Sequence, residues 1–143
     1  MTSVLIIGGG GMIGQKLASS FSANVSLTLL DIGFPDKNQS NARKIIGSVG
    51  DPEIIENSLN DLPEVIYYLA SVVSGEAEAD FSKGWDVNIH AFWAFLSLVK
   101  KLNEKSQGQY KPKIIFTSSI AVFGSPFPNQ IPDDFIAAPR TSY

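Results

Sequence analysis

Short apolar runs alternate with helical patterns along this chain of 143 residues. The first run, from Val4 to Ile7, is continuously apolar, which is typical of a strand buried on both faces of a parallel sheet. The runs predict five strands, at residues 3–7, 26–30, 44–46, 65–70 and 113–117. This alternation of strands and helices favours one parallel sheet with right-handed crossovers.

The helical patterns predict three helices. Over residues 12–21, apolar side chains recur every four residues and so share one helix face. A second helix begins at Asp51 and Pro52, residue types favoured at a helix cap and first turn. A long third helix is predicted over residues 81–102. The polar segment 33–41 and the proline-rich segment 120–143 are expected to be loops, the first of them mobile.

Composition adds that the chain can bury a core, since 44% of its residues are hydrophobic and 17% are charged. The net charge of −3, with scattered Lys and Arg residues, disfavours a nucleic-acid partner. There is no cysteine and His90 is the only histidine, so thiolate chemistry is excluded and no metal site is expected. No apolar run reaches the roughly 18 residues of a membrane span, so we expect a cytoplasmic protein without a membrane partner.

The strongest local motif is the glycine-rich turn after the first strand, with Gly8, Gly11 and Gly14 in the spacing G-x-x-G-x-x-G. The first glycine can turn sharply, the second lets backbone approach a pyrophosphate, and the third lets the helix pack closely. The amides of Met12 and Ile13 would then meet the anion at the positive end of the helix dipole. The alternative is a flexible glycine loop without a ligand.

Asp31 comes at the end of the predicted second strand, directly after residue 30 and 23 residues after Gly8. An acidic residue at this distance can accept hydrogen bonds from both hydroxyls of an adenosine ribose. Its charge would repel a 2′-phosphate, and no basic residue follows before Lys37, so NAD is preferred over NADP. The alternative is that Asp31 only caps the turn before Gly33.

The glycine spacing resembles that of the extended short-chain dehydrogenase/reductase family, which includes nucleotide-sugar epimerases and dehydratases. Further stretches similar to that family are Tyr68-Leu69-Ala70-Ser71, Val87-Asn88-Ile89, residues 116–124 and Pro139-Arg140-Thr141-Ser142-Tyr143. Residues 69–81, 119–124 and 131–134 resemble its D-erythronate dehydrogenase branch, whose members oxidise a four-carbon sugar acid with NAD. The resemblance implies an α/β fold of the Rossmann type, with a doubly wound parallel sheet of five strands in the order 3-2-1-4-5.

The resemblance also implies roles for residues outside the glycine turn. Ser48 and Val49 would lie at the adenine, although the family often has Gly-Asp where this chain has Gly47-Ser48. Asn88 would belong to the cofactor site in the long helix. Leu69, Ala70 and Ser71 would lie beside the nicotinamide ribose. Ser119 would orient the substrate oxygen; the alternative is that it only satisfies backbone groups at a strand end. Tyr143 would be the catalytic base; the alternative is that it is a frayed terminus.

The expected function is that of an NAD-dependent oxidoreductase that takes a hydride from carbon 2 of a sugar acid such as D-erythronate. Residues 1–143 are expected to be a partial NAD-binding domain that stops before the catalytic helix and the family's lysine, four residues after Tyr143. We therefore expect this chain alone to bind NAD weakly or moderately and to turn over negligibly, a prediction that sustained oxidation of erythronate would contradict.

The sequence leaves two other functions open, namely a nucleotide-sugar epimerase or dehydratase and a non-catalytic NAD(H)-binding module. The expected partner is a sugar acid or a nucleotide sugar. Trp85, Phe92 and Phe95 lie at helical spacing. They are interpreted most simply as core, with the face of a possible homodimer as the alternative.

Overall fold

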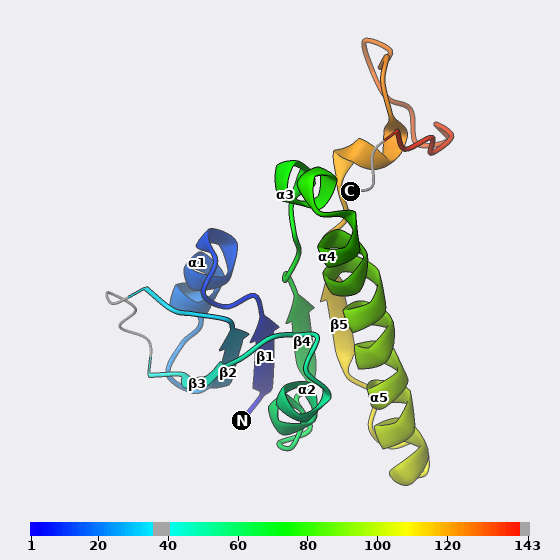
Figure 1. Ribbon diagram of the computed structural model, residues 1–143. Helices are drawn as coiled ribbons and strands as arrows, with labels where there is room; N and C mark the ends of the chain where they lie inside the picture. The colour runs from blue at the N-terminus through cyan, green and yellow to red at the C-terminus, as the bar shows by residue number, and fades with distance from the viewer. Residues whose placement is uncertain (36–40, 141–143) are drawn as a thin grey trace.

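The structure, a computed structural model, describes residues 1–35 and 41–140, so part of the predicted loop 33–41 lies outside it. Five strands form one sheet in the order β3-β2-β1-β4-β5, with every neighbouring pair parallel (Figure 1). This confirms the predicted fold class and strand order. The strands are β1 Ser3–Ile7, β2 Ser26–Asp31, β3 Arg43–Ile46, β4 Val65–Tyr68 and β5 Lys113–Phe116.

Helices cover both faces of the sheet, as expected for a doubly wound fold. Alternate residues of β1 point to opposite faces, so Val4 and Ile6 pack with Ala18 of α1 (Met12–Ser20). Their neighbours Leu5 and Ile7 belong to the larger core on the other face. That face carries α2 (Pro52–Ser58) and α5 (Ala91–Lys105).

The long helix predicted over residues 81–102 is interrupted. It consists of α4 (Phe81–Trp85), a π-helical turn η1 (Asp86–His90) and α5, and a separate short helix, α3 (Ser74–Ala79), precedes it. Asp80 begins α4, because its carboxylate accepts a hydrogen bond from the amide of Lys83 at 3.0 Å. Lys83 also pairs with Glu76 of α3, and that hydrogen bond raises the pKa of Lys83.

Strand β4 ends two residues earlier than predicted, at Tyr68. Leu69 still donates to the carbonyl of Ile7 at 2.8 Å, but Ala70 passes directly under Gly8, where the chain leaves the sheet. After β5, the chain continues through the 3-10 turn η2 (Ile120–Phe123) into an irregular arm, which projects beyond the carboxyl edge of the sheet (Figure 1).

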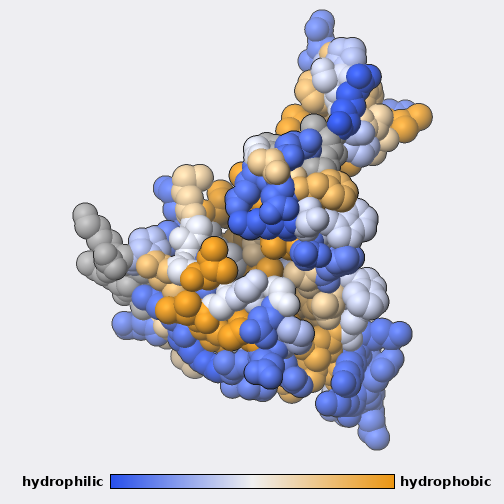
Figure 2. All heavy atoms as spheres, viewed as in Figure 1, coloured by the Kyte–Doolittle hydropathy of each residue, from blue (hydrophilic) through white to orange (hydrophobic). Residues whose placement is uncertain are grey.

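The aromatic residues of the long helical segment divide between core and surface. Phe95 is fully buried and, with Phe92, packs against the Tyr68 ring at centroid distances of 5.2 and 4.8 Å. Trp85 lies 46% exposed on the outer side. The core interpretation therefore applies to Phe95 and Phe92 and not to Trp85. Figure 2 shows hydrophilic side chains gathered at the C-terminal end of α5.

Candidate functional site

The glycine-rich turn leaves β1 with Gly8 in a left-handed conformation, at φ +90°. The amides of Gly8 and Gly9 both donate to the carbonyl of Leu30, at 2.8 and 3.0 Å, which fixes the turn over the end of β2. A Cβ atom at Gly8 would lie 2.8 Å from the amide nitrogen of Ala70. Only glycine therefore combines this backbone conformation with such a close approach to the β4 loop.

The turn runs directly into α1, whose first residues offer backbone groups rather than side chains. Gly11 is the N-cap and no side chain of the described residues caps this end. A Cβ atom at Gly11 would have a single neighbour, at 3.5 Å, so this side of the turn is open. At Gly14 a Cβ would lie 2.2 Å from the Gly8 carbonyl oxygen, which shows how closely helix and turn pack. The side chains of Met12 and Ile13 are exposed.

Asp31 and Gly10 form a contact that the sequence pattern did not predict. The Asp31 carboxylate accepts from the amide of Gly10 at 2.8 Å and from the amide of Gly33 at 3.4 Å. A Cβ atom at Gly10 would lie 2.1 Å from the Gly33 carbonyl oxygen. The carboxylate thus holds the turn in place as well as capping its own loop, because the shorter of its two bonds is to the turn.

Gln15 supports the same turn and was also missed. Its side-chain amide donates to the carbonyl of Gly10 at 2.6 Å, so α1 holds the turn that precedes it. The polar residue that follows Gly14 within an otherwise apolar first turn was the available signal.

A pocket of about 340 Å³ lies at the carboxyl ends of β4 and β5. It brings together four of the residues singled out by the sequence: Ala70, Ser71, Asn88 and Ser119. Thr117 and Ser118 also line it, so the pocket wall carries three consecutive hydroxyls. The Ser119 hydroxyl accepts from the amide of Ala121 at 3.2 Å and so begins η2, which leaves its hydrogen to donate elsewhere.

Asn88 joins the helical segment to the loop after β4. Its side-chain oxygen accepts from the amide of Val72 at 2.8 Å, and its side-chain nitrogen donates to the Val72 carbonyl at 2.9 Å. Asn88 lies in the π-turn η1, which re-aims side chains relative to a regular helix. The residue therefore fixes the loop that carries Leu69, Ala70 and Ser71.

A sequence profile of the NAD dependent epimerase/dehydratase family matches residues 4–143. The chain belongs to this family. The cofactor expected from the sequence, NAD, is the one that the family's description names. Membership also confirms the resemblance to extended short-chain dehydrogenases/reductases that the motifs indicated.

Two family relatives are D-erythronate dehydrogenases. That of Cupriavidus necator is 34% identical over 154 residues, covering 99% of this chain and 46% of the relative. That of Haemophilus influenzae is 31% identical over 147 residues, covering 98% of this chain and 45% of the relative. The chain thus spans about half the length of the curated relatives it matches.

A solved structure with the same fold is the nucleoside-diphosphate-sugar epimerase from Agrobacterium tumefaciens. It superimposes with a TM-score of 0.85 and 37% sequence identity, over 99% of this chain and 44% of that protein. Its match extends through the glycine turn and the hydroxyl-lined pocket.

The residues of the family's cofactor region fit a dinucleotide. The turn has no room for side chains at Gly8, Gly10 and Gly14, yet it is open at Gly11, which is the shape a pyrophosphate cradle requires. The family's frequent Gly-Asp after the third strand is replaced by Gly47-Ser48, and the Ser48 hydroxyl accepts from the amide of Gly50 at 3.1 Å. Val49, beside it, is buried.

Tyr143 and His90 are not part of the glycine turn or of the hydroxyl-lined pocket as the structure describes them. Tyr143 lies outside the described residues. His90 is exposed, its Nδ1 lies 3.0 Å from Asp86 and its Nε2 accepts from the indole N–H of Trp85 at 2.7 Å. Both ring nitrogens therefore have partners within α4 and η1.

Residues 1–35 and 41–140 contain no group of three or more His, Cys, Asp or Glu side chains placed to bind a metal. No helix in the same ranges has both the length and the apolar character needed to cross a membrane.

Proposed function

We propose that this chain forms the NAD-binding domain of a dehydrogenase that oxidises a sugar acid, of the D-erythronate type, at carbon 2. One observation carries the proposal, which is that Ala70 joins the glycine turn to the hydroxyl-lined pocket. It lies against Gly8 of the glycine turn and also lines the hydroxyl-bearing pocket. A dinucleotide held at the turn would therefore reach the pocket that contains Ser119.

The proposed roles follow from the chemistry of each group. The open amides at the start of α1 bind the pyrophosphate, and the Asp31 carboxylate accepts from the adenosine ribose hydroxyls. NAD, when bound, supplies the hydride acceptor. The Ser119 hydroxyl donates to the substrate oxygen, and Tyr143 takes the proton of the oxidised hydroxyl, a role assigned to it by the family resemblance.

Calorimetric titration with NAD and NADP tests the cofactor assignment. We expect heat from NAD binding and at least about tenfold weaker binding of NADP, since Asp31 faces the 2′-phosphate. Formation of NADH with D-erythronate, measured on the full-length protein by absorbance, tests the activity. A folded sample that binds neither dinucleotide would refute the assignment.

A nucleotide-sugar epimerase is the second candidate, favoured by the 37% identity to a protein described as a nucleoside-diphosphate-sugar epimerase. The two candidates differ in the fate of the hydride, because an epimerase returns it to the substrate. An epimerised nucleotide sugar without net NADH would select this candidate over the dehydrogenase. Binding of NAD without turnover of either substrate class by the full-length protein would indicate a non-catalytic NAD(H)-binding module.

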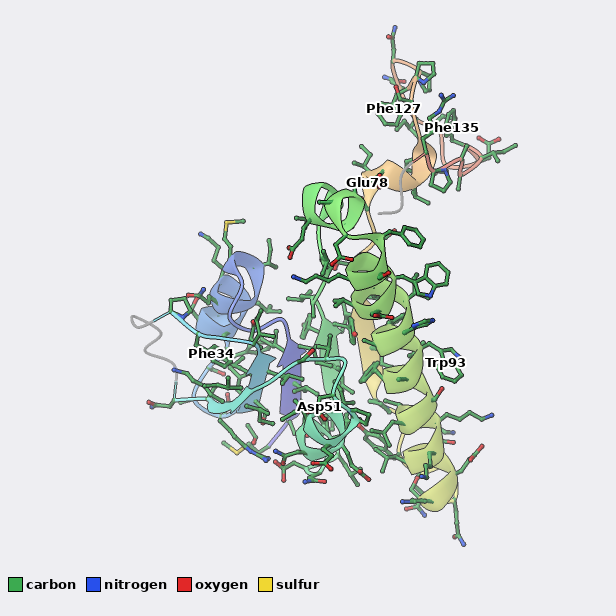
Figure 3. The ribbon with its side chains drawn as sticks, in the orientation of Figure 1. Phe34, Asp51, Glu78, Trp93, Phe127 and Phe135 are labelled. Atoms are coloured by element: carbon green, nitrogen blue, oxygen red, sulfur yellow. The ribbon has the colours of Figure 1, made fainter. Side chains whose placement is uncertain are left out.

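We also propose that a second copy of the protein packs against the outer face of α4 and α5. Exposed apolar side chains follow this face at intervals of three or four residues: Phe81, Trp85, Ile89, Trp93 and Leu96. Figure 3 shows Trp93 pointing away from the sheet. Symmetric pairing would bury the same row on both copies.

A further inference from the structure

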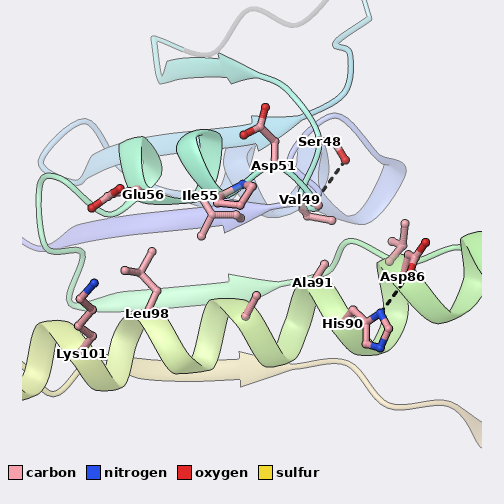
Figure 4. A pocket seen from close by; sticks show the side chains of 14 residues that line it. Ser48, Val49, Asp51, Ile55, Glu56, Asp86, His90, Ala91, Leu98 and Lys101 are labelled. Atoms are coloured by element: carbon pink, nitrogen blue, oxygen red, sulfur yellow. Dashed lines mark hydrogen bonds and ion pairs between the residues drawn. The ribbon is translucent and has the colours of Figure 1, made fainter.

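A groove of about 790 Å³ runs between α2 and α5 (Figure 4). It begins at Ser48 and Val49, which follow the carboxyl end of β3, and continues past Leu98 and Lys101 of α5. Its floor is mainly apolar and is formed by Val49, Pro52, Ile55, Val87, Ala91 and Leu98. The groove has the size and polarity needed to take a flat heterocycle at its Ser48 end.

The proposed position of the cofactor directs its base into this end of the groove. Asp31 ends β2, and its carbonyl accepts from the amide of Gly47 at 2.9 Å, so the end of β3 is joined directly to the ribose-binding residue. The pyrophosphate lies toward α1, on the other side of Asp31. The base on the same ribose therefore falls beside Ser48 and Val49. This step rests on the proposed function.

Ser48 then presents its hydroxyl at this end of the groove, where it can both donate and accept a hydrogen bond. Its hydroxyl already accepts from the amide of Gly50, which leaves one hydrogen to donate and one lone pair to accept. Adenine presents an amino group at position 6, a donor, whereas a 6-oxopurine presents an acceptor there. A neutral hydroxyl satisfies either one, while a carboxylate would accept only from the amino group.

The carboxylates that line the groove do not substitute for an acid at position 48. Asp51 caps α2 by accepting from the amide of Glu53 at 2.9 Å, and its side chain points away from α5 (Figure 4). Asp86 pairs with His90 at 3.0 Å. Glu56 lies at the opposite end of the groove from Ser48 (Figure 4). The amino group of an adenine would therefore meet the Ser48 hydroxyl and no dedicated anionic acceptor among these residues.

We propose that the base site does not discriminate the substituent at position 6 of the purine, so that it binds a 6-oxopurine dinucleotide about as well as NAD. The tolerance follows from the neutral side chain at position 48, where a carboxylate would favour the 6-amino group. The ligand class is nicotinamide dinucleotides whose second base is a 6-amino- or 6-oxopurine.

The test compares NAD with nicotinamide hypoxanthine dinucleotide by calorimetry on the full-length protein. We expect dissociation constants within about threefold of each other. Ser48→Asp should prefer NAD by at least about tenfold, because a hydrogen bond to a charged acceptor is worth more than one to a hydroxyl and the 6-oxo group would face the carboxylate. Ser48→Ala should keep the ratio of the unaltered protein.

Ala94→Asp is the matched control, since it adds the same charge to the groove wall on α5 without changing residue 48. We expect it to leave the ratio unchanged. A tenfold preference of the unaltered protein for NAD would overturn this inference and leave the proposed function standing, as would an unchanged ratio in Ser48→Asp. Failure of both dinucleotides to bind a folded sample would overturn the inference together with the proposed function.

Discussion

At the scale of single residues, the candidate site is built from backbone groups whose positions depend on the absence of side chains. Gly8, Gly10 and Gly14 each lie so close to other backbone that a Cβ atom would collide. The side chains of Asp31 and Gln15 hold this arrangement, through bonds to the amide and to the carbonyl of Gly10. The turn is therefore specified by steric crowding and by these two polar side chains.

Gly10→Ala tests that requirement. Its Cβ would meet the Gly33 carbonyl at 2.1 Å and the Asp31 carboxyl carbon at 2.9 Å, so the turn must shift. We expect a loss of about 1–3 kcal/mol in unfolding free energy, the usual cost of overpacking, and at least about tenfold weaker NAD binding. Denaturant unfolding and calorimetry measure the two effects.

Gly75→Ala is the control for Gly10→Ala, because a Cβ at Gly75 meets nothing within 4 Å. Gly75 lies in α3, where alanine is the better helix former, so stability should stay equal or rise slightly. Equal stability and equal NAD affinity in Gly10→Ala would contradict the crowded turn.

Only part of this site could be predicted from the sequence. The spacing of Gly8, Gly11 and Gly14 is a local pattern, so it was visible. The need for Gly10 was not, because it arises from Asp31 and Gly33, which lie more than 20 positions away along the chain and meet it only in the folded sheet. Gln15 was missed for a different reason: its partner is a backbone carbonyl only five positions away, and its polar character in an apolar turn was the available signal.

Two buried tyrosines provide a second residue-scale prediction. The Tyr110 hydroxyl donates to the carbonyl of Pro63 at 3.1 Å, whereas the Tyr68 hydroxyl has no partner among the described residues. Tyr110→Phe should therefore lower the unfolding free energy by about 1 kcal/mol, and Tyr68→Phe should leave it unchanged or raise it. Equal losses in the two variants, measured in urea, would contradict this difference.

The same tyrosines predict how stability depends on pH. Burial raises the pKa of Tyr68 and of Tyr110 to about 12. In the unfolded chain a tyrosine ionises near pH 10, so between about pH 10 and 12 the unfolded state binds fewer protons than the folded one. Stability should therefore fall as pH rises through this window. Tyr68→Phe should reduce the slope, which unfolding midpoints at successive pH values would measure.

At the scale of elements, the segment after β4 departs most from what periodicity predicts. The apolar spacing from Phe81 onward indicated one helix, but the structure divides it at η1 and places α3 before it. The five strands were found within one or two residues, because continuous apolar runs report directly on burial. The break at η1 was not visible, since it accompanies a contact between Asn88 and Val72.

Asn88→Leu tests the role of that contact. The substitution removes both bonds to Val72 and leaves its amide and carbonyl without these partners, so we expect lower thermal stability and weaker NAD binding. Asn88→Asp keeps the acceptor for the Val72 amide and loses the donor to the Val72 carbonyl. Its thermal stability and NAD affinity should therefore lie between those of the unaltered protein and those of Asn88→Leu. If Asn88→Leu retained full NAD affinity, the loop would not need this anchor.

At the scale of the whole molecule, the outer face of α4 and α5 predicts self-association. Trp93→Glu places a charge within the apolar row and should shift the protein from dimer toward monomer. Light scattering measures the shift, and circular dichroism checks that the fold is retained. Ala94→Glu adds the same charge on the side of α5 that lines the groove between α2 and α5, and it should leave the molecular mass measured by light scattering unchanged. A monomer before any substitution would contradict the proposed interface.

If the glycine turn holds the cofactor as proposed, cofactor binding is coupled to folding. The turn takes its hydrogen bonds from β2 and lies against the loop after β4, so three segments that are distant along the chain must already be in register before it exists. The unfolded polypeptide then holds no part of the cradle in usable form. NAD should consequently act as a pharmacological chaperone, raising the melting temperature with the logarithm of its concentration.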